Sequence, residues 1–79
     1  MRVDKFLKVS RIIKRRTIAN EACDAGRVMI NGKVVKAGAA VKIGDIIEIQ
    51  FGNNTTKIEV LDLKESTKKE DAVNMYKSL

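Results

Sequence analysis

Residues 2–36 read RVDKFLKVSRIIKRRTIANEACDAGRVMINGKVVK, and this stretch decides the fold. It opens with apolar and small side chains that recur every three or four residues, the spacing of one face of an α-helix. These positions are Val3, Phe6, Leu7, Ser10 and Ile13. Basic side chains occupy the other faces, and Asp4 precedes Lys8 by four residues, an order that favours helix. We therefore predict an amphipathic first helix with a cationic exterior.

A second helix is predicted directly after the basic residues 14–16. Thr17 is a suitable N-cap, and small or apolar side chains follow it at helical spacing. These side chains belong to Ile18, Ala19, Ala22, Cys23 and Ala25. Gly26 is expected to end the helix, because a residue without a Cβ adopts the left-handed conformation most easily.

The pattern changes from helical to alternating after Gly26. Residues 27–30 and 33–36 flank the pair Asn31-Gly32. This pair is the strongest short signal of a β-hairpin, because both of its residues tolerate a positive φ. The sequence therefore predicts a tight hairpin directly after the second helix.

Two further strands are predicted beyond the hairpin. In residues 46–51 the side chains of Ile47, Ile49 and Phe51 share one face, and residues 57–61 direct Ile58 and Val60 inward. The expected fold class is α+β, with two N-terminal helices packed on a small, mostly antiparallel sheet of about four strands.

The end of the chain predicts a third helix. Thr67 and Glu70 match a capping box, and apolar side chains follow at helical spacing. We expect a helix from about Lys68 to the end of the chain, folded back on the sheet rather than protruding toward a partner. The expected division is a main domain at 1–64 and a C-terminal helical extension at 65–79.

The excess positive charge is confined to the start of the chain. The net charge is +6, and residues 1–16 hold seven basic side chains against one acid, Asp4. Residues 17–79 hold nine basic side chains and nine acids. Such a segregated charge is typical of a surface that binds a polyanion, with nucleic acid as the first candidate and an acidic membrane surface as the second.

The residues that enzymes and metal sites need are scarce. The chain has no histidine and a single cysteine, Cys23, which lies on the apolar face of the second helix and is expected to be a buried core thiol. The sequence contains neither G-x-x-x-x-G-K-[ST] nor G-x-G-x-x-G, the two glycine-rich motifs that bind phosphate. We therefore predict a binding module without a cofactor or metal.

No apolar run approaches 18 residues and the first residues are charged, which favours a cytoplasmic protein without a membrane span.

The composition favours structured RNA as the partner. Arginine offers a planar fork of donors that suits phosphate, whereas three aromatic residues are too few for rows of stacked bases. Packing of the two helices is expected to bring Arg2, Lys5, Arg15 and Arg16 to one ridge that binds backbone phosphates. A DNA-binding regulator is the alternative use of two basic helices, although the hairpin follows the second helix at once and no dimerisation helix precedes the pair. The targeting domain of an RNA-modifying enzyme is a further class, but 79 residues leave no room for a catalytic domain.

The ordered series RVDKFL, RIIKRRTIA, AGRVMINGKVVK and VKIGDIIEI, over about residues 2–51, resembles the S4 domain, also called the S-four or αL RNA-binding motif. The start of the chain and the stretch TKKEDAVNMY are similar to the stand-alone S4 proteins of bacterial ribosome-associated quality control. These proteins are related to the heat-shock S4 protein, which binds free large ribosomal subunits. The resemblance implies two helices and a small sheet, with RNA held by the helical face.

The same resemblance implies a function and a site. The implied protein is a non-enzymatic factor that binds the large ribosomal subunit with peptidyl-tRNA and works with RqcH while an alanine tail is added to the stalled chain. We expect the protein to be a monomer. Its implied partners are large-subunit rRNA, P-site peptidyl-tRNA and RqcH. Arg2 and Arg16 are implied to be the principal RNA contacts and Asp4 an orienting group. The supporting contacts are Lys5, Lys8, Arg11, Lys14 and Arg15. Recycling of large subunits, as by the heat-shock relative, is the alternative.

Overall fold

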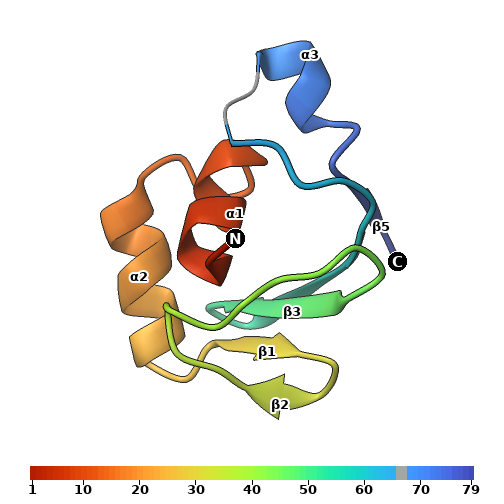
Figure 1. Ribbon diagram of the computed structural model, residues 1–79. Coiled ribbons are helices and arrows are strands. Elements are labelled where there is room, and N and C mark those ends of the chain that lie inside the picture. The colour runs from red at the N-terminus through yellow and green to blue at the C-terminus, as the bar shows by residue number, and fades with distance from the viewer. Residues whose placement is uncertain (66–67) are drawn as a thin grey trace.

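The computed structural model describes residues 1–65 and 68–79, and in that part of the chain two helices lie on one face of a small sheet (Figure 1). The elements in chain order are α1 (Val3–Val9), α2 (Arg16–Asp24), β1 (Val28–Ile30), β2 (Lys33–Val34), β3 (Ile46–Phe51), β4 (Asn54–Val60), α3 (Lys69–Ala72) and β5 (Tyr76–Ser78). The α+β class predicted from the sequence is confirmed. None of the helices in these residues is long and apolar enough to cross a membrane.

The sheet has the strand order β2-β1-β3-β4-β5, and all neighbouring strands are antiparallel. The predicted hairpin is confirmed, with Asn31 at φ 52° and Gly32 at φ 83° in its turn. Positive φ at both central residues gives the turn the twist that flanking strands require. The second hairpin strand is shorter than predicted, since β2 contains only Lys33 and Val34.

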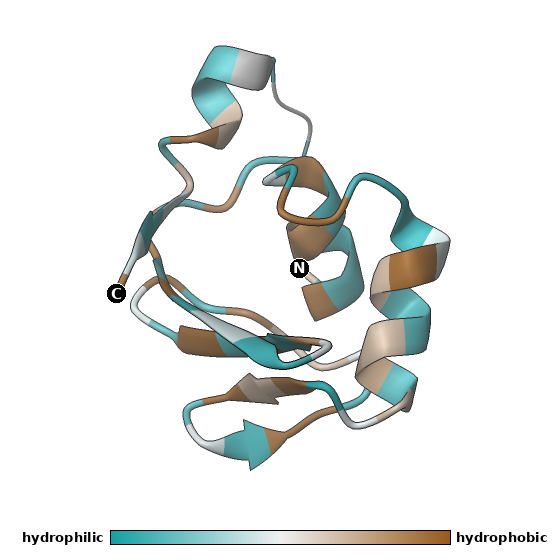
Figure 2. Ribbon diagram, turned by 180° about the vertical axis from the view of Figure 1, so that it is seen from behind, coloured by the Kyte–Doolittle hydropathy of each residue, from teal (hydrophilic) through white to brown (hydrophobic). Residues whose placement is uncertain are grey.

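The core lies between α1 and the sheet. Phe6 and Leu7 of α1 are fully buried, as are Ile47 and Ile49 of β3. Hydrophilic and hydrophobic residues follow one another along α1 and along the strands in Figure 2, as expected for elements with one buried face. Phe51 was predicted to share the buried face, but it is 42% exposed because β3 runs past the edge of the core into the turn toward β4.

The first helix is shorter than predicted, because the apolar stripe in the sequence extends to Ile13. It ends at Val9, and Arg11 adopts a left-handed conformation with φ 62°. The N–H of Arg11 donates to the carbonyl of Lys8, and the N–H of Ile13 reaches back to the carbonyl of Leu7. A left-handed residue after a helix satisfies its last carbonyls and reverses the chain. Ile13 is buried because the chain turns back toward the core, so its spacing was right and its predicted helical conformation was wrong.

The second helix begins one residue earlier than the predicted cap. Arg15 is the N-cap residue and Thr17 lies inside the first turn. Gly26 follows the helix at φ 77°, as predicted. Ala19 and Cys23 are fully buried, but Ile18 is 47% exposed, because each residue of a helix points about 100° away from its neighbour and only one narrow stripe of α2 meets the core. Ala25 is also exposed, in the C-cap position.

The predicted C-terminal helix is confirmed, and it begins at Lys69, but its predicted extent to the end of the chain is wrong. The helix α3 ends at Ala72, and the last residues form β5, which adds a fifth strand along β4. The open edge of β4 offers backbone hydrogen bonds that a longer helix would leave unmade, and the N–H of Leu79 donates to the carbonyl of Lys57. Ala72 and Met75 are buried, so the prediction that the tail folds back is confirmed. The predicted cap at Thr67 lies outside the described residues.

Candidate nucleic-acid interface

The centre of the candidate interface is a buried carboxylate. Asp4 lies in the first turn of α1 and its side chain is 2% exposed. The backbone N–H of Lys5 donates to Asp4 Oδ1 at 2.8 Å. A buried charge is stable only when it is paired and hydrogen-bonded, so the partners of Asp4 are essential to its position.

Two arginines and an asparagine supply those partners. Arg2 donates through Nε to Oδ1 and through Nη2 to Oδ2, each at 3.2 Å, a bidentate pair. Arg16 Nε lies 3.4 Å from Oδ2, and Asn20 Nδ2 lies 3.3 Å from the same oxygen. We call these four residues, Arg2, Asp4, Arg16 and Asn20, the arginine clamp. The arginine side chains are 52% and 47% exposed, so their guanidinium groups reach solvent while Asp4 does not.

The backbone explains why these side chains meet. Arg2 is the N-cap residue of α1 in an extended conformation, and it forms a bridge with Ala40. The N–H of Val3 also donates to the carbonyl of Ala39 at 2.8 Å, so the segment before β3 fixes the start of the helix. Arg16 and Asn20 are four residues apart in α2 and therefore share a face, which the packing of α2 against α1 turns toward Asp4.

The environment of Asp4 favours its charged form. Burial raises the pKa of the carboxyl, but the hydrogen bonds from Asn20 and from the backbone of Lys5, with the charges of Arg16 and Arg2, outweigh burial and lower the pKa below its ordinary value. Asp4 therefore stays ionised at neutral pH and holds the two guanidinium groups. The i, i+4 pairing with Lys8 suggested by the sequence is not among the ion pairs in residues 1–65 and 68–79.

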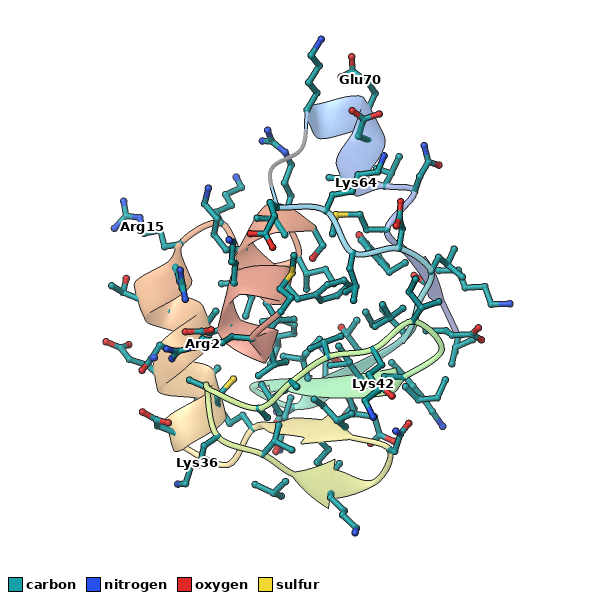
Figure 3. The ribbon with its side chains drawn as sticks, in the orientation of Figure 1. Arg2, Arg15, Lys36, Lys42, Lys64 and Glu70 are labelled. Carbon is teal, nitrogen blue, oxygen red and sulfur yellow. The ribbon has the colours of Figure 1, made fainter. Side chains whose placement is uncertain are left out.

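The other predicted cations do not join the clamp. Lys5 pairs instead with Glu65, which follows β4. Arg15 extends from the start of α2 away from Arg2, which lies between α1 and α2 (Figure 3). Of the four residues predicted to converge, the structure therefore brings together only Arg2 and Arg16. Four of the seven predicted cations are exposed and form no ion pair with any residue that the structure describes. They are Lys8, Arg11, Lys14 and Arg15.

Asn20 was not among the site residues predicted from the sequence. Its distance of four residues from Arg16 was the available signal, but no rule of composition links an asparagine on α2 to an aspartate on α1.

An open depression lies beside the clamp and is lined by Arg2, Asp4, Arg16, Thr17, Asn20 and Glu21. The guanidinium donors that Asp4 does not use can bind a backbone phosphate there, which is the chemistry that the arrangement supports best.

Cys23 has no part in this chemistry. It is fully buried, as predicted. Burial, with the nearby charges of Asp4 and Asp24, raises the pKa of its thiol to about 11. The thiol is therefore protonated at neutral pH and is a poor nucleophile.

Comparison with known proteins places these observations in a family. Residues 1–47 match the family described as the S4 domain. The chain is 55% identical over 76 residues to the RQC P-site tRNA stabilizing factor of Streptococcus pneumoniae, covering 96% of this chain and 86% of that protein. It is also 55% identical to the factor of the same name from Bacillus subtilis, over 96% of this chain and 88% of the relative. The trimeric structure of heat shock protein 15 from Vibrio cholerae superposes with a TM-score of 0.92 at 26% identity, over 100% of this chain and 81% of that one.

Proposed function

The chain belongs to the S4 domain family and, within it, to the RqcP family of RQC P-site tRNA stabilizing factors, and on that premise we propose that it stabilises P-site tRNA in ribosome-associated quality control. It is a non-enzymatic RNA-binding factor. In the fuller proposal it binds the large ribosomal subunit that still carries peptidyl-tRNA and supports the RqcH-dependent alanine tailing of the stalled chain. Its proposed partners are large-subunit rRNA, P-site tRNA and RqcH, which it meets in the cytoplasm as a monomer.

The observation that carries the proposal is the arginine clamp. Two half-exposed guanidinium groups share one buried carboxylate, so both are oriented before RNA arrives. Groups that are already ordered lose little conformational entropy on binding, which strengthens each contact that they make. We therefore assign the principal phosphate contacts to Arg2 and Arg16, and the orienting role to Asp4.

The remaining cations are assigned a supporting role. They lie on α1, on the turn after it and at the start of α2, and they add positive potential along the path of a phosphate backbone. They are Lys5, Lys8, Arg11, Lys14 and Arg15. We also propose that residues 1–64 form the RNA-binding domain and that residues 65–79 extend it, although β5 ties this extension to the same sheet.

Recycling of large subunits is the second candidate function, and the close similarity to the heat shock protein 15 structure favours it. The two candidates differ in their protein partner. Quality control with alanine tailing needs RqcH beside the tRNA, whereas recycling of the heat-shock type does not.

The test is affinity purification of the tagged full chain from cells, with Arg16→Ala as the matched control. We expect large-subunit rRNA, tRNA and RqcH, without small-subunit rRNA, and we expect the variant to recover much less of each. Large subunits without RqcH or alanine-tailed chains would favour recycling. Recovery of genomic DNA, or of no nucleic acid at moderate salt, would contradict both candidates.

A further inference from the structure

The depression beside the arginine clamp has an unexpected charge balance. Arg2 and Arg16 contribute two positive charges to its lining, and Asp4 and Glu21 contribute two negative charges. The lining is therefore neutral, although Arg2, Asp4 and Arg16 belong to residues 1–16, which carry the whole net charge of the protein. A site that bound phosphate alone would have no use for the second carboxylate, because a like charge repels the ligand.

The two carboxylates differ in their availability. Both oxygens of Asp4 accept hydrogen bonds within the clamp. Glu21 is exposed and forms no ion pair with the residues at 1–65 and 68–79. Its carboxylate therefore has no ion-pair partner in that part of the chain, and it lines the same depression as the guanidinium donors of Arg2 and Arg16.

We propose that Glu21 accepts a hydrogen bond from a ribose 2′-hydroxyl of the RNA strand whose phosphate lies on Arg2 and Arg16. This inference rests on the proposed function and identifies Glu21 as a specificity-determining residue within it. The phosphate is held by the guanidinium groups and kept away from Glu21 by repulsion. The group that meets Glu21 must be a neutral donor next to a phosphate, and the 2′-hydroxyl is such a group on every ribonucleotide.

The geometry of double-stranded RNA favours the sugar over a base. The major groove of an A-form helix is too deep and narrow for side chains to read, whereas the 2′-hydroxyls and phosphates line the wide minor groove. An exposed glutamate on a helix surface reaches the edge of that groove without unpairing a base. The contact distinguishes RNA from DNA and is independent of base sequence.

The experiment compares two duplexes of identical base sequence, one of RNA and one of 2′-fluoro RNA. Both carry the same phosphates in A-form geometry, but fluorine cannot donate a hydrogen bond. We expect the wild-type chain to bind the RNA duplex about tenfold more tightly, the effect of one hydrogen bond to a charged acceptor. Glu21→Ala is expected to bind the two duplexes within about twofold of each other.

Asp24→Ala is the matched control, because it removes the same charge from α2 at an exposed position outside the depression. It should raise both affinities slightly by reducing repulsion and leave the roughly tenfold preference for RNA intact. If Glu21→Ala keeps the wild-type preference, or if the wild type has none, the inference is wrong while the proposed function stands. If neither duplex binds at low salt, phosphate binding by the clamp is contradicted as well, and the proposed function loses its structural support.

Discussion

The arginines of the clamp and the cations around the turn are all positively charged, but only the clamp arginines are held in place by an ion pair. We call the second group the turn cations; they are Lys8, Arg11, Lys14 and Arg15. The clamp arginines are held by a buried carboxylate, and the turn cations are exposed without an ion pair among the described residues. Fixing a long charged side chain costs up to about 2 kcal/mol of conformational entropy. In the clamp much of this entropy is already lost in folding. Each clamp arginine is therefore expected to contribute more to the binding free energy than a turn cation of equal charge, because its ion pair with Asp4 already orders it.

The two regions also act at different ranges. An oriented guanidinium recognises phosphate over a hydrogen-bond distance, whereas a flexible cation acts through its potential, which extends about 10 Å at 0.1 M salt. We infer that the turn cations increase the rate of encounter with RNA and that the clamp fixes the bound orientation.

Asp4→Asn should have the largest effect, because it removes the charge that holds the clamp together. An asparagine has one acceptor oxygen in place of two, and its amide nitrogen would face a donor of Arg2 or Arg16. We expect the free energy of unfolding to fall by about 2–3 kcal/mol, less than for a fully buried ion pair since both arginines are half exposed. Urea denaturation measures this change.

Asp24→Asn is the control for Asp4→Asn, since it removes an exposed carboxylate from the same helical layer. It should change the free energy of unfolding by less than about 0.5 kcal/mol. Equal destabilisation by the two variants would show that Asp4 does not organise the clamp.

The pH dependence of stability should report the same carboxylate. The pKa of Asp4 is lowered in the folded protein, so its charged form stabilises the fold at every pH above its unfolded pKa of about 3.9. This stabilisation is lost as the pH falls from that value through the lowered folded pKa. We therefore expect the stability difference between wild type and Asp4→Asn to shrink on acidification below about pH 4. A difference that stays constant down to pH 2 would place the effect of the mutation elsewhere.

The sequence predicted most of the fold because its signals were local. Asn31-Gly32 specifies a turn by backbone conformation alone, and the alternation in β3 specifies its buried face. The errors arose where a tertiary contact overrode a local pattern. Residues 73–79 carry a helical stripe, but the open edge of β4 draws Tyr76–Ser78 into a strand.

The candidate site was predictable in part for the same reason. The charge of residues 1–16 is visible in the sequence, and the family resemblance selects Arg2, Asp4 and Arg16 from it. Neither source reveals Asn20, since its contact with Asp4 spans 16 residues and depends on how α2 packs against α1. Nor does either separate Lys5, which the fold pairs with Glu65, from the turn cations, which form no ion pair in the part of the chain that the structure describes.

Arg16→Ala and Lys14→Ala compare the clamp directly with the turn. Arg2, Asn20 and the backbone of Lys5 still satisfy Asp4 when Arg16 is removed, so the variant should fold. We expect Arg16→Ala to weaken binding to large ribosomal subunits about tenfold or more, and Lys14→Ala to weaken it less than about threefold. Co-sedimentation at several salt concentrations measures both. Equal losses would contradict the distinction between oriented and flexible cations.

Glu65→Gln should have the smallest effect and the opposite sign. Glu65 forms an exposed ion pair with the ammonium group of Lys5. The hydrogen bond from Lys5 lowers the pKa of the Glu65 carboxyl, so this group is ionised at neutral pH. RNA must displace Glu65 before a phosphate can bind Lys5. Removing the charge should therefore tighten RNA binding by roughly twofold, since exposed pairs of this kind are weak. Glu70→Gln, an exposed acid of α3, is the control for the change in net charge. If both variants tighten binding equally, Glu65 acts only through the net charge, and Lys5 belongs with the turn cations.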